Sequence, residues 1–163
     1  MSATDNRGIE HSCAFTGHRP ERLALPEAEV IRWLNEQVRL AVNDGYTDFI
    51  TGMQRGVDIW AAEAVMKLRE EDKNIRLIAA CAFRGMEERW EAEWQNRYRS
   101  ILQSADEIHY IGDRPGRQAF FARNRRMVER ASRLIAVYTG APGGTKETIE
   151  YARSKHLQIV SIR

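Results

Sequence analysis

Apolar runs of strand length alternate with helical patterns along this chain, and this alternation constrains the fold more than any other feature. Helices are indicated where apolar side chains such as Val30, Leu34 and Val38 recur at helical spacing. Strands separated by helices require right-handed crossovers, which place the strands parallel in one sheet. We therefore expect an α/β fold: a single-domain, Rossmann-like, open and mostly parallel sheet of about six strands, with helices on both faces. The predicted strands are residues 12–16, 48–51, 75–83, 105–111, 134–139 and 157–162, and the predicted helices are residues 27–43, 58–70, 87–104, 118–131 and 146–154.

The composition is that of one globular domain without a membrane-spanning segment. Hydrophobic residues make up 43% of the 163 and charged residues 29%, and no linker-like stretch divides the chain. We expect a flexible polar segment at residues 1–10, followed by one domain at residues 11–163. Cys13 and Cys81 lie in predicted strands, and the four histidines are scattered without the spacing of metal ligands. These patterns favour a cytoplasmic protein with buried thiols and no metal site.

Three glycine loops follow predicted strands at points where a helix begins. They are residues 16–20 (Thr-Gly-His-Arg-Pro), 51–58 (Thr-Gly-Met-Gln-Arg-Gly-Val-Asp) and 140–145 (Gly-Ala-Pro-Gly-Gly-Thr). Glycine lets backbone N–H groups approach an anion, and a helix that starts directly afterwards adds its unsatisfied amides and positive dipole end. Because parallel strands end at one edge of a sheet, we expect the three loops to form one pocket for a phosphate-bearing ligand.

Individual residues in these loops have more than one possible role. Asp58 either caps the helix that it opens or accepts a hydrogen bond from a ribose hydroxyl. Arg19 can hold a phosphate, whereas His18 can stack, donate a hydrogen bond or carry a proton. Gly143 and Gly144 either supply amides to a phosphate or form a tight turn.

These motifs, together with Arg123-Asn124 and with Thr148 after Gly143-Gly144-Thr145, resemble the YpsA-like branch of the SLOG superfamily over nearly the whole chain from Cys13. That superfamily also contains the DNA-processing protein DprA and the Lonely-guy phosphoribohydrolases. The resemblance implies a Rossmann-like fold, a nucleotide or ADP-ribose-like ligand, and a homodimer. Helical apolar residues that include Tyr98 and Met127 favour the same dimer. The expected ligand-binding residues are Thr16, Gly17, His18, Arg19, Gly52, Gly56, Asp58, Arg123, Asn124, Gly143, Gly144, Thr145 and Thr148.

The resemblance leaves catalysis open. In the phosphoribohydrolase relatives the motif resembles Gly-Gly-x-Gly-Thr-x-x-Glu, and aligning Gly144-Thr145 with its Gly-Thr places Thr148 at the position of the catalytic glutamate. We therefore expect a protein that binds or senses a nucleotide-derived ligand. The alternative is hydrolysis of a nucleotide N-glycosidic bond, with Asp58 or Glu63 as the carboxylate. A second alternative, single-stranded DNA binding of the DprA kind, is not favoured, because the net charge is only +2.

Overall fold

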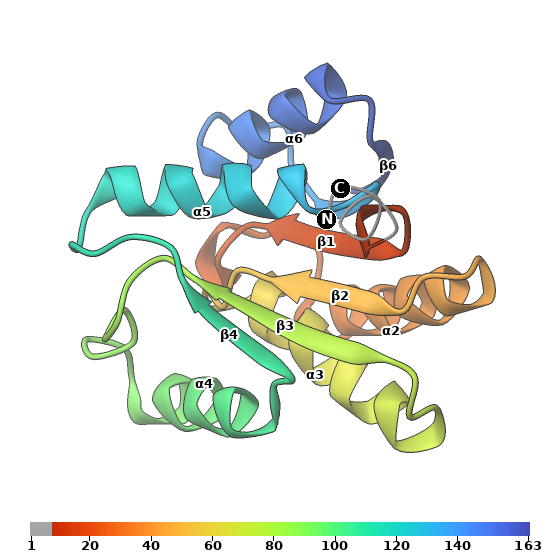
Figure 1. Ribbon diagram of the computed structural model, residues 1–163. Coiled ribbons are helices and arrows are strands. Elements are labelled where there is room, and N and C mark those ends of the chain that lie inside the picture. Colours follow the sequence, from red (N-terminus) through yellow and green to blue (C-terminus); the bar gives the residue numbers. More distant parts are fainter. Residues whose placement is uncertain (1–7) are drawn as a thin grey trace.

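The computed structural model describes residues 8–163 and contains one sheet of six parallel strands (Figure 1). Every pair of neighbouring strands is parallel, in the spatial order β4-β3-β2-β1-β5-β6. This arrangement confirms the predicted Rossmann-like fold class. The strands are β1 (Ser12–Gly17), β2 (Asp48–Thr51), β3 (Arg76–Cys81), β4 (Glu107–Tyr110), β5 (Arg133–Val137) and β6 (Gln158–Ile162).

Helices cover both faces of this sheet. The helices α2 (Glu27–Asn43), α3 (Val57–Glu71) and α4 (Ala92–Ser104) pack on one face, whereas α5 (Arg117–Glu129) and α6 (Gly144–Ser154) pack on the other. A short 3-10 helix, η1 (Pro20–Arg22), follows β1. Among the described residues no helix combines the length and the apolar character that crossing a membrane requires.

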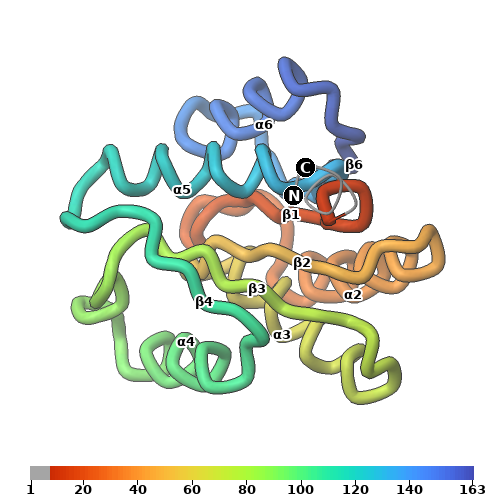
Figure 2. Tube along the Cα trace, viewed as in Figure 1, coloured from red at the N-terminus to blue at the C-terminus, as the bar shows by residue number. Residues whose placement is uncertain are grey.

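The direction in which the sheet grows reverses once. The chain adds β2, β3 and β4 on one side of β1, and α5 then carries it back to the other side, where β5 and β6 follow (Figure 2). β1 and β5 are neighbours in the sheet, and the loops that follow them lead away in opposite directions, toward β2 and toward β6. In open α/β sheets a crevice forms at such a switch point, beyond the carboxyl ends of the strands.

Alternating side chains of the strands divide the core into two layers. Cys13 and Phe15 of β1 pack against the layer of α2, α3 and α4, whereas Ala14 between them packs against the layer of α5 and α6. The ring of Phe15 stacks on that of Phe49 in β2, with 6.2 Å between the centroids. Period-two alternation in strands that are covered on both faces explains why these runs are almost wholly apolar.

The prediction of a helix over residues 87–104 is wrong in its first turn, because α4 begins only at Ala92. Residues 84–89 form turns that include Gly85 at φ +81°, and the Gln95 side chain donates to the carbonyls of Glu87 and Glu88. Trp90 lies outside the helix, and its ring packs edge-on against that of Tyr98, with 5.4 Å between the ring centroids. Because Trp90 packs onto the helix from outside and lies four residues before Trp94, the sequence shows helical spacing where there is no helix.

The predicted flexible segment falls largely on residues 1–7, which lie outside the described residues. Residues 8–10 form a helical turn directly before β1.

Candidate functional site

A hollow of about 390 Å³ lies at the switch point, between the ends of β1 and β5. The loop after β1, the start of α3, the inner side of α5 and the start of α6 form its walls. The structure therefore brings the three glycine-containing segments to one edge of the sheet. The expected residues that line the hollow are Thr16, Gly17, His18, Arg19, Asp58, Arg123, Asn124, Gly143, Gly144 and Thr145.

The glycines of the first two loops pack the loops against one another. A Cβ atom on Gly17 would lie 2.5 Å from a methyl carbon of Val57, and a Cβ on Gly56, which has φ +90°, would lie 2.9 Å from the carbonyl oxygen of His18. Gly52 and Gly56 do not line the hollow. Only the third loop presents open glycines, because a Cβ on Gly144 would meet nothing closer than 3.8 Å.

Asp58 and Arg123 are two buried, oppositely charged residues in the lining of the hollow, and the Arg123 charge acts on Asp58 without a direct hydrogen bond between them. Their exposed fractions are 7% and 4%. Asp58 Oδ2 accepts a hydrogen bond from the backbone N–H of Gln54 at 3.2 Å, whereas Asp58 Oδ1 is buried without a partner among the described residues. Arg123 donates to the carbonyl of Gly52 and, at 2.7 Å, to Oδ1 of Asn124. Burial raises the pKa of Asp58 to about 6, against the opposing effect of the Arg123 charge.

His18 connects the loop after β1 to the loop after β5. Its Nε2 accepts a hydrogen bond from the backbone N–H of Thr139 at 3.1 Å, which places the ring proton on Nδ1. Burial, and then the nearby Arg22 guanidinium, lower the pKa of His18 below its ordinary value. His18 is therefore neutral at neutral pH. Of the roles left open by the sequence, hydrogen bonding fits this geometry better than carrying a proton.

The start of α6 presents backbone amides to the hollow. Gly143 precedes the helix at φ +139°, and no side chain caps this end. The first amides of a helix have no partner within it, so this end can bind an anion. Thr148 lies one turn further on, in a neighbouring groove, and its hydroxyl donates to the carbonyl of Gly144 at 2.8 Å.

Glu63, the other candidate carboxylate, lies away from the hollow. Its two carboxylate oxygens accept hydrogen bonds from Arg97 of α4 at 2.5 and 3.0 Å. Asp58 is thus the only one of the two catalytic candidates that lines the hollow.

Several lining residues were not predicted from the sequence. Arg117 and two phenylalanines come from the start of α5, where Gly116 precedes the helix at φ +134°. Gly116 lies between a predicted strand and a predicted helix, as the glycines of the other three loops do, and this pattern could have identified the segment as part of the site. The two phenylalanines are Phe120 and Phe121. The remaining lining residues that were not predicted are Phe15, Arg22, Gln54 and Glu147.

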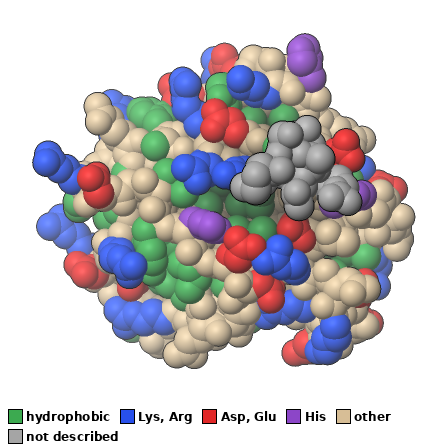
Figure 3. Space-filling model, in the orientation of Figure 1, with side chains coloured by type: hydrophobic (Ala, Val, Ile, Leu, Met, Phe, Trp, Pro, Cys, Tyr) green, Lys and Arg blue, Asp and Glu red, His purple; other side chains and the backbone are tan. Residues whose placement is uncertain are grey.

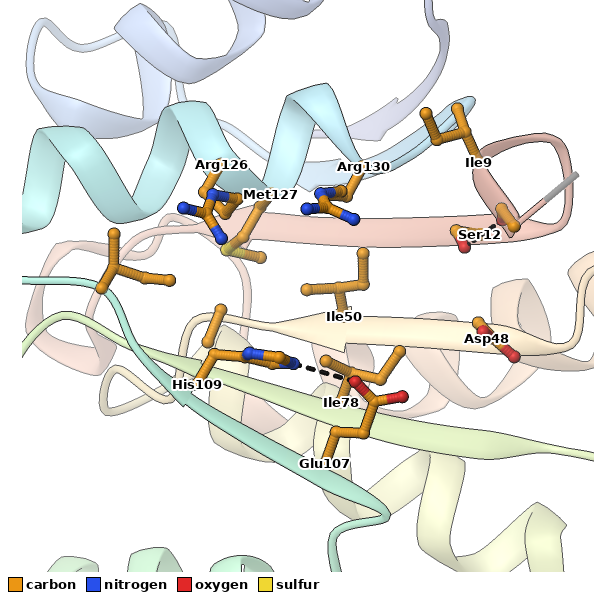
Figure 4. Close-up of a pocket in the computed structure, with 13 residues that line it drawn as sticks. Ile9, Ser12, Asp48, Ile50, Ile78, Glu107, His109, Arg126, Met127 and Arg130 are labelled. Atoms are coloured by element: carbon orange, nitrogen blue, oxygen red, sulfur yellow. Dashed lines mark hydrogen bonds and ion pairs between the residues drawn. The ribbon is translucent and has the colours of Figure 1, made fainter. Parts of the chain in front are cut away.

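A second hollow of about 220 Å³, which we call the sheet trough, lies on the face of β2, β3 and β4 that α5 leaves uncovered (Figure 3). Figure 4 shows Arg126 of α5 and Arg130, directly after that helix, on one side and the hydrogen-bonded pair of Glu107 and His109 on the other, above an aliphatic floor that includes Ile50. None of the expected ligand-binding residues lines this trough. The described residues hold no cluster of three or more groups suited to a metal ion.

A crevice at the switch point of an open parallel sheet, flanked by glycine turns and a helix N-terminus, defines a Rossmann-like α/β domain. Residues 13–161 match the model of the YspA SLOG family, and the chain belongs to that family. A UPF0398 protein of Bacillus cereus strain B4264 is 31% identical over 151 residues, which cover 87% of this chain and 82% of the relative. A UPF0398 protein of Bacillus thuringiensis strain Al Hakam shows the same identity and coverage.

Two solved structures share the fold. DNA processing protein A of Streptococcus pneumoniae superposes with a TM-score of 0.67 at 18% identity and covers 94% of this chain. The Helicobacter pylori protein of the same name gives a TM-score of 0.66 at 16% identity and covers 98% of this chain. The present chain spans 50% of the S. pneumoniae chain and 68% of the H. pylori chain. At these identities the likeness establishes the fold.

Proposed function

We propose that the hollow at the switch point binds a nucleotide or nucleotide-derived ligand, with its phosphate at the start of α6. The observation that carries this proposal is the unpartnered Oδ1 of Asp58. A buried carboxylate oxygen without a hydrogen bond is costly, and a ligand hydroxyl such as that of a ribose would remove the cost. The predicted interpretation of Asp58 as a helix cap has less support, because no side chain caps α3.

The charges around the hollow favour an anionic group. Arg19, Arg22 and Arg117 are exposed side chains on its rim, and the positive end of the α6 dipole points to the same space. Arg22 already donates to the carbonyl of Pro142 at 3.3 Å, which connects the first loop to the third. A phosphate between these groups would receive charge-assisted hydrogen bonds from two loops.

Calorimetric titration of the purified protein tests this function. The ligands are ribose 5-phosphate, AMP, GMP, NAD and ADP-ribose. Replacement of Arg19 by Ala removes one charge-assisted contact, so we expect about a ten-fold or greater loss of affinity. Arg39→Ala is the matched control, because Arg39 is an exposed residue of α2 that pairs with Glu71. Absence of binding by every ligand would contradict the proposal.

Hydrolysis of an N-glycosidic bond is the second candidate, and one observation favours it. Asp58 lies in the hollow with a pKa raised to about 6, which suits an acid–base group near neutral pH. Chromatography of AMP and GMP after incubation with the protein would detect the free base. Base release that disappears in Asp58→Asn supports the hydrolase, whereas binding without release supports the binding function.

Nucleic-acid binding is a third, less favoured candidate. The H. pylori protein is described by its single-stranded DNA binding mode, and the rim of the present hollow carries Arg117, Phe120 and Phe121. Such basic and aromatic residues can also hold a strand. Gel shifts with short single strands over a salt series separate the cases, because strand binding weakens steeply with salt.

We also propose a homodimer through the sheet trough, in a cytoplasmic protein with buried free thiols. Tyr98 is buried within the chain and contributes no surface for pairing, whereas Met127, although 3% exposed, lines the trough. The trough instead offers its aliphatic floor, which includes Ile50 and Ile78, and a two-fold axis would bring Arg126 and Arg130 of one copy against the carboxylate-bearing wall of the other. Light scattering tests this proposal: the wild type should have twice the mass of the chain, and Arg126→Glu should return it to the monomer mass.

A further inference from the structure

The surface between α5 and α6 carries a third hollow, of about 480 Å³, which adjoins the hollow at the switch point. Phe121, Asn124 and Glu147 line both, so one continuous cleft runs from the start of α6 along the outer side of the two helices. We call this second part the α5–α6 groove. Its further lining residues are Arg125, Thr148, Glu150 and Tyr151.

Two aromatic side chains give the groove surfaces on which a flat ring can stack. Phe121 is half-buried where the two hollows join. Tyr151 is held in place, because its hydroxyl donates to Glu129 at 2.5 Å and two cations, the Arg125 guanidinium at 4.9 Å and Lys155 Nζ at 5.4 Å from the ring centroid, lie over its ring. An aromatic side chain that is fixed before binding loses little entropy when a base stacks on it.

The two parts of the cleft differ in charge. Three exposed arginines and the start of α6 surround the first hollow, Glu147 in the first turn of α6 lines both hollows, and the exposed carboxylate of Glu150 belongs to the groove alone, together with Arg125. Neither carboxylate forms an ion pair or a hydrogen bond with another side chain among residues 8–163. Carboxylates repel a phosphate and accept only N–H or O–H donors. A nucleotide that enters the cleft is therefore oriented with its phosphate at the start of α6 and its base in the groove.

We propose that the α5–α6 groove is a base subsite for a guanine nucleotide, an inference that rests on the proposed nucleotide-binding function. Guanine presents adjacent N–H and NH₂ donors on one edge, which match the two acceptor oxygens of a single carboxylate such as that of Glu150. Adenine presents an acceptor nitrogen beside its single amino group and would meet repulsion there. The groove thus adds both affinity, through stacking, and a preference between purines.

The test is calorimetry with ribose 5-phosphate, AMP and GMP on the wild type and on three variants. Tyr151→Ala removes a stacking surface, and Glu150→Gln removes a carboxylate. Glu70→Gln, an exposed residue of α3 on the opposite face of the sheet, is the control for charge. We expect GMP to bind the wild type about ten-fold or more tightly than ribose 5-phosphate, because base–aromatic stacking contributes on that scale. Tyr151→Ala should abolish most of this gain without changing the affinity for ribose 5-phosphate, and Glu150→Gln should reduce the preference for GMP over AMP.

The possible results separate the two proposals. If ribose 5-phosphate binds but GMP binds no more tightly, or if the gain persists in Tyr151→Ala, the base subsite is refuted and the phosphate site remains. If GMP and AMP bind equally, or if their ratio is unchanged in Glu150→Gln, the guanine preference is refuted. If none of the three compounds binds the wild type, both proposals are refuted together. Circular dichroism of each variant confirms that a loss of binding reflects the groove rather than unfolding.

Discussion

Replacing Arg123 by Met tests whether the buried charged pair holds the site together. Methionine keeps much of the length of the arginine side chain but has no charge and no hydrogen-bond donor. The carbonyl of Gly52 and the Oδ1 of Asn124 would each lose a donor, and the Asp58 carboxylate would lose its positively charged neighbour. Because Arg123 is 96% shielded from solvent, we expect the change to act on folding as well as on ligand binding.

The magnitude depends on pH through Asp58. Its pKa is about 6 in the folded protein against an ordinary value of 3.8, so the folded state binds this proton more tightly than the unfolded state. The wild-type free energy of unfolding therefore falls as the pH rises from about 4 to about 6, by an amount on the order of 3 kcal/mol from this group. Removing Arg123 raises this pKa further. At pH 8 the variant should lose about 3–5 kcal/mol, because the ionised Asp58 carboxylate is then buried without a neighbouring positive charge. At pH 5 Asp58 is neutral, and we expect a smaller loss of about 1–3 kcal/mol from the missing hydrogen bonds.

Urea unfolding followed by tryptophan fluorescence measures these losses at both pH values, and Trp60 is a buried reporter. The double variant with Asp58→Asn should recover about 1–3 kcal/mol at pH 8 relative to the sum of the single changes, because the unpaired charge is then absent. Arg39→Met controls for the loss of a surface arginine. Equal losses at pH 5 and pH 8, or strict additivity in the double variant, would refute the reasoning.

Three further predictions concern the same site. Gly52→Ala would place a Cβ 2.8 Å from Asp58 Oδ2, so we expect the free energy of unfolding in urea to fall by about 1–3 kcal/mol and ligand binding in calorimetry to weaken. Unchanged stability and binding would show that the side chains of Asp58 and Arg123 can move to make room for the methyl group. The affinity for ribose 5-phosphate should rise about ten-fold from pH 5 to pH 7 as Asp58 ionises, with a pKa of about 6. In Asp58→Asn only the rise that comes from the phosphate itself should remain, and equal slopes in both proteins would exclude Asp58 as the acceptor. Glu63→Gln, which removes a partly exposed ion pair with Arg97, should cost about 0–1 kcal/mol and leave calorimetric binding unchanged, whereas lost binding would return Glu63 to the candidate site.

The sequence predicted the fold more completely than the site, for a physical reason. Helical and strand periodicity is local, and the predicted bounds of residues 27–43 and 48–51 agree with α2 and β2. The failure at residues 87–91 has the same origin, since Trp90 has helical spacing from Trp94 but packs on Tyr98 from outside the helix. Local patterns identify elements well and their ends less well.

The role of the glycines could not be obtained from local patterns. The sequence predicts that Gly17 and Gly56 contact a ligand, because glycine loops after strands commonly bind phosphates. In the structure the missing side chains of both glycines let loops touch, with Gly17 against Val57 and Gly56 against His18, and of the two only Gly17 also lines the hollow. Whether a glycine faces a ligand or another loop is decided by contacts between segments far apart in the chain. The burial of Arg123, on a helix rich in exposed arginines, is hidden from the sequence for the same reason.

The position of the buried carboxylate has a consequence for any chemistry at this site. In the phosphoribohydrolase relatives that the sequence resembles, the catalytic glutamate belongs to the segment that follows the Gly-Gly-x-Gly-Thr loop. Here that place is taken by Thr148, whose hydroxyl is already bonded to Gly144 and whose side chain lies in the α5–α6 groove. The carboxylate in the hollow comes instead from Asp58, at the start of α3, and the Arg123 charge acts on it. A ligand held by the amides of α6 would thus meet the acid from α3 rather than from the helix that holds its phosphate. Transplanting a glutamate to position 148 would place a second carboxylate in the groove, where repulsion from Glu147 and Glu150 opposes its ionisation.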